Sequence, residues 1–347
     1  MREDEAARYV SALCRELQLR KGYLADAPVK TLYFGGGTPS RLTIDQLGSI
    51  ISAIDSVFGL SHLEELTVEC NPDDITQDYV CALRALGVNR ISMGVQTFND
   101  NQLTFLRRRH TAAQALEAVR ICRDSGIGNI SIDLMYGLPG QTLEMFRTDL
   151  ETALSADVEH ISSYCLSYEE GTPLHSLRDE GRLIPATDEL CSQMFSFMCS
   201  TLRNAGYDHY EISNFCKPGY HSRHNSSYWT GITYLGLGAA AHSYNGTSRQ
   251  WAPSNLDAYM SAVEQNAPAF DSEHLSATDL LNEKIMLSLR TSRGLDLSTL
   301  TPADRLSVLN SAQPFIARAQ LIHQNNTLRL SESALFISDS IICNLFR

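Results

Sequence analysis

The stretch VKTLYFGGGTPS, residues 29–40, joins a short apolar segment typical of a buried strand to three consecutive glycines. Four further segments of this kind predict strands at 65–70 (ELTVEC), 90–96 (RISMGVQ), 129–137 (NISIDLMYG) and 160–168 (HISSYCLSY). Apolar residues at helical spacing predict a helix over 5–22, and others follow the strands at 43–59, 76–87, 111–126, 141–156 and 188–206. Strands and helices that alternate at this spacing indicate βα units around a parallel sheet.

The order of these elements limits the architecture. The series starts with a helix, so we expect a barrel-like α/β arrangement whose first strand is missing. An open doubly wound sheet is the rival architecture, and periodicity alone does not separate the two.

The pattern changes after residue 207. YDHYEISNF alternates like an edge strand, and a loop-rich stretch follows to about 268. In the last part of the chain, QNN (324–326) stands between two apolar segments and predicts a hairpin turn before a final helix. We therefore expect three units: a barrel-like domain at 1–206, a flanking strand-and-loop region at 207–268, and a small helix-plus-wing module at 269–347.

Composition narrows the class of protein. The net charge of −12 argues against a nucleic-acid partner, because binding to phosphates needs a basic face. No apolar run approaches the roughly 18 residues of a membrane span, and the acidic N-terminus MREDEAARYV is unlike a secretory signal. We expect a cytoplasmic protein without an integral membrane segment. The nine cysteines include no CxxC or CxxxC pair, which favours reduced, mostly buried thiols.

Candidate functional residues gather at the predicted carboxyl ends of the strands. In parallel barrels these ends meet at one rim, where binding sites are built. The group comprises Gly35, Gly36, Gly37, Glu69, Gln96 and Asp133. Each residue alone is commonly only a turn former, but four strand ends in register suit a nucleoside-like ligand with an amino-acid end. Arg108, in the cluster RRRH (107–110), could bind the carboxylate of that ligand. Such a cluster is also typical of a solvated basic face.

The chain also contains longer motifs in a fixed order. The segments YFGGGTPS, ELTVECNPDD, NRISMGVQTFND, FLRRRH, NISIDLMYGLPGQT, SSYCLSYEEGTPL, HYEISNF and SRHNSSYWTGITYLGLGAAAHSY span essentially its whole length. Together they resemble the haem-chaperone (HemW-type) branch of the oxygen-independent coproporphyrinogen III oxidase family, a group of radical-SAM proteins. The resemblance implies a partial (β/α)₆ barrel with a winged-helix-like C-terminal domain. It also implies contacts to S-adenosylmethionine (SAM) at Gly36, Gly37, Thr38, Glu69, Gln96, Arg108 and Asp133.

Residues 224–229 match the motif HNxxYW, which the resemblance associates with haem binding in the chaperone branch. His224 is then the candidate haem-iron ligand, and Tyr228 and Trp229 are candidates for stacking on the porphyrin. The plainer interpretation is that a single histidine in a polar loop is merely exposed.

One departure from the resemblance concerns the iron–sulfur cluster. Family members open with a strand and a C-x3-C-x2-C loop that holds a [4Fe–4S] cluster, whereas this chain starts beyond that point. A truncated start explains this better than an adaptive loss, and radical chemistry by this polypeptide is doubtful. We expect a chaperone that binds haem and passes it to acceptor proteins. The alternatives are a coproporphyrinogen III oxidase of porphyrin biosynthesis and a cluster-free protein that only binds haem or a partner.

Overall fold

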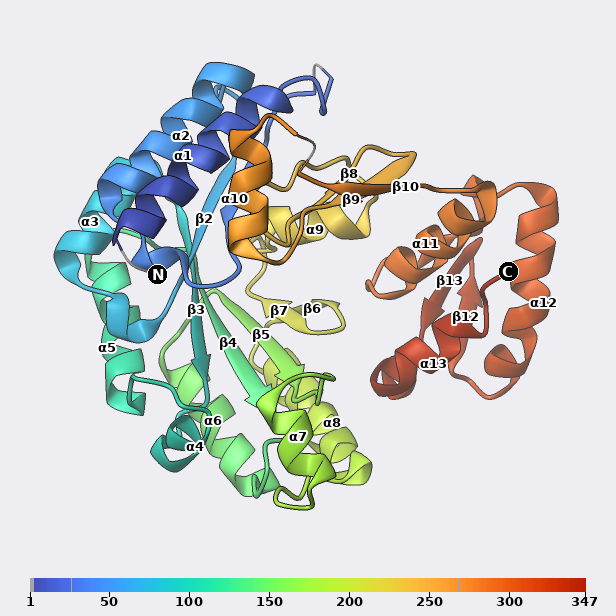
Figure 1. Cartoon of the computed structure of the whole chain (residues 1–347). Coiled ribbons are helices and arrows are strands. Elements are labelled where there is room, and N and C mark those ends of the chain that lie inside the picture. The colour runs from blue at the N-terminus through green and yellow to red at the C-terminus, as the bar shows by residue number, and fades with distance from the viewer. Residues whose placement is uncertain (1–2, 26, 268) are drawn as a thin grey trace.

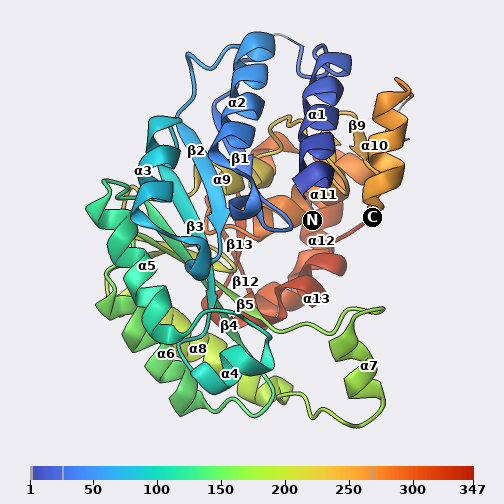
Figure 2. The same cartoon turned by 60° about the vertical axis from the view of Figure 1, so that its left-hand side comes forward.

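A computed structural model describes residues 3–25, 27–267 and 269–347. Among these residues, seven strands form one curled sheet in the order β1-β2-β3-β4-β5-β7-β6 (Figures 1 and 2). Its first five strands are parallel: β1 (Thr31–Phe34), β2 (Glu65–Cys70), β3 (Arg90–Gln96), β4 (Ile130–Tyr136) and β5 (His160–Cys165). Spatial order follows chain order with no reversal, which is the arrangement of a barrel wall. The predicted half-barrel is confirmed, and the doubly wound alternative is wrong.

The predicted helices form before, between and after these strands. They are α1 (Glu3–Leu19), α2 (Ile44–Phe58), α3 (Gln77–Ala85), α5 (Ala112–Asp124), α6 (Leu143–Ser155) and α8 (Asp188–Asn204). Reciprocal capping boxes start two of them: Thr43 with Gln46 in α2, and Thr111 with Gln114 in α5. Sequence analysis missed α4 (Asp100–Phe105) and α7 (Pro173–Asp179), since each is too short to show a helical period.

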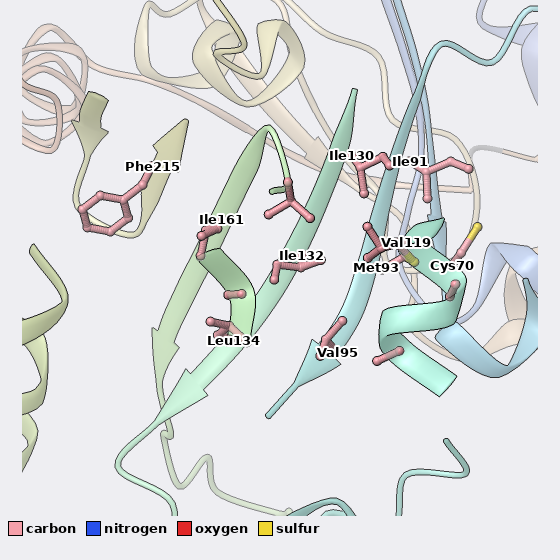
Figure 3. Packing of buried hydrophobic residues seen from close by; sticks show 14 of the residues in the cluster. Cys70, Ile91, Met93, Val95, Val119, Ile130, Ile132, Leu134, Ile161 and Phe215 are labelled. Carbon is pink, nitrogen blue, oxygen red and sulfur yellow. The ribbon is translucent and has the colours of Figure 1, made fainter. Parts of the chain in front are cut away.

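The main hydrophobic core lies between the sheet and the helices that cover its outer face. Side chains that are fully buried there come from alternate positions of neighbouring strands, among them Ile91, Met93, Val95, Ile132 and Ile161 (Figure 3). Because successive strand residues point to opposite faces, the residues between them face the inside of the half-barrel. Those residues are polar yet hidden from solvent: Thr67, Arg90, Ser131 and His160.

The region after α8 differs from its prediction. YDHYEISNF forms a hairpin, β6 (Asp208–Glu211) and β7 (Asn214–Cys216), and not a single edge strand. β7 pairs antiparallel with β5, so the hairpin extends the main sheet. The segment expected to be loop-rich contains α9 (Arg223–Trp229) and α10 (Leu256–Glu264). It also supplies two strands of a second sheet, β8 (His242–Tyr244) and β9 (Ser248–Trp251), which β10 (Asp271–His274) completes.

The C-terminal part has a hydrophobic core of its own, drawn from residues between Leu281 and Leu345. Its elements are α11 (Ala277–Leu289), β11 (Leu295–Asp296), α12 (Pro302–Ala317), β12 (Leu321–Gln324), β13 (Thr327–Leu330) and α13 (Ser338–Cys343). Asn325 and Asn326, both at positive φ, join β12 to β13, as expected for a two-residue hairpin turn. This helix-plus-wing arrangement was predicted. The division at residues 206 and 268 remains our proposal.

Within the described residues, no helix has both the length and the apolar character that crossing a bilayer requires.

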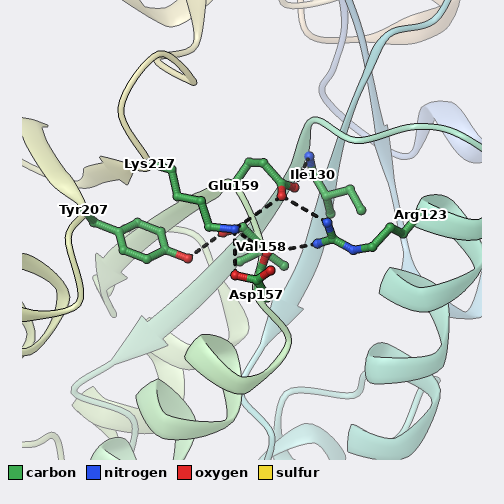
Figure 4. Close-up of polar contacts among 7 residues, drawn as sticks. All are labelled: Arg123, Ile130, Asp157, Val158, Glu159, Tyr207 and Lys217. Carbon is green, nitrogen blue, oxygen red and sulfur yellow. Dashed lines mark hydrogen bonds and ion pairs between the residues drawn. The ribbon is translucent and has the colours of Figure 1, made fainter.

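An ionic network secures the amino end of β5 (Figure 4). The buried Glu159 carboxylate accepts hydrogen bonds from Arg123 (Nη1 to Oε1, 3.1 Å) and from the backbone N–H of Ile130 (3.2 Å). Lys217, just after β7, reaches both Asp157 (2.7 Å) and Glu159 (3.4 Å). The network therefore fastens the antiparallel hairpin and α5 to the parallel part of the sheet.

Replacing Glu159 with Ala should lower the free energy of unfolding by on the order of 2–3 kcal/mol, because a buried backbone N–H and two cations lose their acceptor. Glu117→Ala removes a carboxylate from the exposed pair with Arg120 and should cost far less, because water screens that pair. Chemical denaturation of both variants measures the difference. Equal losses would show that the network adds nothing beyond a surface ion pair.

Candidate S-adenosylmethionine and haem site

The glycine loop after β1 lies at the carboxyl rim of the sheet. Gly36 and Gly37 have φ of 76° and 60°, where a side chain would be strained, and nothing lies within 4 Å of a Cβ at either position. The backbone N–H of Gly36 donates to Glu69 Oε2 (3.0 Å), which fixes the loop against β2. Thr38 is exposed, and its side chain caps no helix. The loop thus offers open backbone to a ligand.

Glu69 is half-buried on the inner face of β2 and is held by β1. Its Oε1 accepts a hydrogen bond from the Tyr33 hydroxyl (2.8 Å). Sequence analysis missed Tyr33, although a signal was available: Leu32 and Phe34 pack on the outer helices, so Tyr33 between them must point inward. The two oxygens of Glu69 are therefore oriented by β1 and by the glycine loop that follows it.

Arg108 and Gln96 converge on Gly94, in the middle of β3. Arg108 Nη2 donates to the Gly94 carbonyl (2.6 Å) and to Asn71 Oδ1 (3.1 Å). A Cβ at Gly94 would lie 2.7 Å from Arg108 Nη2 and 2.9 Å from Gln96 Nε2, so glycine makes room for both side chains. The register shifts between Met93 and Gln96, and such bulges redirect side chains near binding sites. Burial lowers the pKa of Arg108 from its usual high value, and the guanidinium stays charged at neutral pH.

Asp133, on the inner face of β4, completes the group. Burial, and then the charge of Glu69, raise the pKa of Asp133 to about 6, while a hydrogen bond from Ser162 and the charge of Arg108 oppose the rise. The structure thus brings the glycine loop, Glu69, Gln96, Arg108 and Asp133 to one side of the sheet. Its two carboxylates and one guanidinium suit a ligand that carries hydroxyls, an amino group and a carboxylate.

The residues described do not form a site for a [4Fe–4S] cluster. Such clusters take several cysteine thiolates from one short loop, whereas the closest two cysteines in this sequence, Cys191 and Cys199, are eight residues apart. Within the described part of the chain, the one close group of potential metal ligands is Asp208, Cys216 and His221, with a single thiol. No chemical step through a cluster follows from these residues.

The HNxxYW segment forms the short helix α9, not a loop, and its amino end enters the half-barrel. The buried carboxylate of Glu65 accepts hydrogen bonds from the backbone N–H groups of Arg223 (2.9 Å) and His224 (3.0 Å). The His224 ring stacks on Tyr33, with centroids 4.7 Å apart. The same tyrosine therefore contacts both Glu69 and the HNxxYW helix.

The three motif side chains do not point to one place. His224 uses both ring nitrogens, Nδ1 with Thr31 Oγ1 (3.0 Å) and Nε2 with the Tyr228 hydroxyl (3.0 Å). Burial lowers the pKa of His224 to about 4, so the ring is neutral at pH 7. Trp229 instead faces α11, where the Arg290 guanidinium lies 5.6 Å from its ring. Iron ligation by His224 would require its hydrogen bond to Tyr228 to open.

Comparison with known proteins defines the class of this chain. Residues 15–153 match the family model of the radical SAM superfamily, and residues 275–337 match that of the HemN C-terminal domain. The fold superposes on coproporphyrinogen III oxidase (HemN) from Escherichia coli with a TM-score of 0.86. That match covers 100% of this chain and 84% of the other at 22% identity, so it supports the fold alone. The fold is that of a radical-SAM protein.

Curated relatives place the chain more closely. It is 35% identical to the heme chaperone HemW of Bacillus subtilis (strain 168) over 335 residues, which cover 95% of this chain and 87% of that protein. It is 31% identical to the heme chaperone HemW of Mycobacterium tuberculosis, over 97% of this chain and 86% of the relative. The chain belongs to the HemW family.

The raised pKa of Asp133 should make the folding stability of the chain depend on pH. A carboxyl whose pKa rises from 3.8 to about 6 on folding opposes folding once the pH exceeds both values. Asp133→Asn should therefore be more stable than the unaltered chain at pH 8, by up to roughly 3 kcal/mol, and should lose this advantage at pH 4. Thermal unfolding of both proteins across this range checks the sign. An advantage that is independent of pH would show that the ionised carboxylate is not the cause.

Proposed function

We propose that this chain is a haem chaperone, which binds haem and passes it to acceptor proteins. The observation that carries the proposal is similarity to HemW chaperones along nearly the full chain, which includes an intact HNxxYW segment. The similarity to the oxidase is too low to carry an activity. The partners that follow are haem and the proteins that receive it.

The geometry of α9 supports a role in holding a porphyrin. Tyr228 is 37% exposed, and Trp229 lines a cleft between the barrel and the C-terminal part. Flat aromatic side chains at a partly open surface stack well on a porphyrin plane. The neutral His224 is hydrogen-bonded to Thr31 on β1 and to Tyr228, so its ring positions the helix on β1.

Haem titration tests the proposal. Replacing Trp229 with Ala should weaken haem binding by roughly tenfold, because a large apolar contact is lost. Trp251→Ala is a matched control, since it removes the only other tryptophan of the chain, on β9, outside this cleft. The change in Soret absorbance reports binding. Failure of the unaltered protein to bind haem at micromolar concentration would remove the chaperone function.

We also propose that SAM binds at the rim of the sheet. Glu69 and Asp133 would accept hydrogen bonds from the ribose hydroxyls, and Arg108 would hold the carboxylate by its fork of donors. Gly36, Gly37 and Thr38 would contribute backbone and hydroxyl groups to the loop over the ligand, with Gln96 beside Arg108. Open backbone at the glycines and the charge pattern around Gly94 support this assignment.

Calorimetric titration with SAM measures this site directly. Glu69→Gln keeps the size of the side chain but removes a charged acceptor, so SAM affinity should fall by roughly tenfold or more. Asp271→Asn, on the exposed strand β10, is the control and should change nothing. Equal SAM affinity in the Glu69 variant and the unaltered protein would place SAM elsewhere.

A further inference from the structure

A cleft of about 720 Å³ lies between the barrel and the C-terminal part. One wall comes from β6, the segment before α9 and α9 itself; the other comes from α11 and the loop that follows it. Side chains that shape the two walls include Tyr210, His221, Trp229, Leu280, Leu287 and Arg293. Its volume falls within the range of pockets that bury a small organic ligand, and aromatic and aliphatic side chains on opposite walls suit a flat apolar one.

Backbone hydrogen bonds hold the two walls together. The Ser292 N–H donates to the Tyr210 carbonyl (3.0 Å), and the Ile212 N–H donates to the Arg290 carbonyl (3.1 Å). The Arg290 guanidinium also lies over Trp229 of the opposite wall. The cleft is therefore fixed by contacts across it, and a ligand would not need to create it.

The charges around the cleft leave an excess of cation. The carboxylate of Glu283 is paired with Arg249 (2.6 Å), and that of Asp296 accepts from the backbone N–H of Ser298 (2.8 Å). Lys284 donates a hydrogen bond to the Thr299 carbonyl (3.2 Å), and its charge also acts on the Asp296 carboxylate. Arg293 is exposed and has no hydrogen bond or ion pair within the described part of the chain. The cations Lys284 and Arg293 thus face one further carboxylate, Asp296, beyond the one that Arg249 neutralises, so net positive charge remains for a ligand with carboxylates.

The two histidines near α9 differ in what their nitrogens contact. His224 does not line the cleft, and both of its nitrogens are hydrogen-bonded. His221 does line the cleft, and its side chain is 43% exposed. The nearest polar partner that the structure gives it is Asp208 Oδ2, 3.8 Å from Nε2 and too far for a hydrogen bond. The Tyr210 ring packs edge-on against His221 and limits its movement.

We propose that this cleft is the haem pocket, in which His221 supplies the axial nitrogen and Arg293 and Lys284 pair with the propionates. The inference rests on the proposed chaperone function and assigns its cargo a place. A ligating imidazole needs a free nitrogen, which His221 has and His224 lacks. Asp208, with Oδ2 3.8 Å from Nε2, would become the outer carboxylate partner of such a ligand once the two groups move to hydrogen-bond distance.

The test compares haem with metal-free protoporphyrin IX on the full chain. His221→Ala should weaken haem binding by about tenfold or more and shift the Soret band, because the axial nitrogen is lost and even changes to outer partners of metal ligands have effects of this size. It should leave protoporphyrin IX binding unchanged, because that molecule has no iron to ligate. His224→Ala should keep the haem spectrum, and so should His323→Ala, which removes an exposed histidine of β12 outside the cleft.

A second pair of variants tests the pocket while leaving the proposed axial ligand, His221, in place. Arg293→Glu should weaken haem and protoporphyrin IX alike, because both carry propionates. Arg318→Glu, an exposed charge reversal after α12, should weaken neither. Unchanged haem binding and spectrum in His221→Ala, or their loss in His224→Ala alone, would overturn the assignment while the chaperone function stands. An unaltered chain that binds no haem would overturn both.

Discussion

Side-chain alternation along the five parallel strands is the constraint on which the rest of this structure depends. Every second residue packs into the core under the outer helices, so every other one must face the inside of the half-barrel. The inner residues stand side by side across the strands: Glu69 lies beside Ser92, Ser92 beside Ser131, and Ser131 beside His160. A one-residue slip in register would exchange this polar face with the core. The register of the sheet therefore positions the site.

Polar groups inside the half-barrel are costly unless they are paired, and the pairing joins distant segments. His160 contacts Ser131 (2.8 Å) and the Tyr210 hydroxyl (2.8 Å), which ties β5 to the edge hairpin. Glu65 holds the amino end of α9 in the same way. Two nitrogens of the buried Arg90, Nε and Nη1, have no hydrogen-bond acceptor among the described residues. Ordered water inside the half-barrel would accept hydrogen bonds from them. Tyr33 is the meeting point, since its hydroxyl orients Glu69 and its ring supports His224.

Much of this could be predicted from the sequence because it depends on local pattern. The strand ends that carry Glu69 and Asp133 follow from alternation, and the capping pairs and the Asn325–Asn326 turn follow from backbone chemistry. The rest depends on contacts between remote segments. Thr31 and His224, for example, are 193 residues apart in the chain. No local signal shows that both nitrogens of His224 are engaged or that His221 faces a cleft.

Haem is proposed to bind on the side of α9 that faces the C-terminal part, away from the rim that suits SAM. Iron anomalous scattering from crystals of the protein with bound haem locates the metal most directly. We expect one peak between α9 and α11, within bonding distance of a His221 nitrogen. A peak at His224, or at the rim beside Glu69 and Asp133, would contradict it.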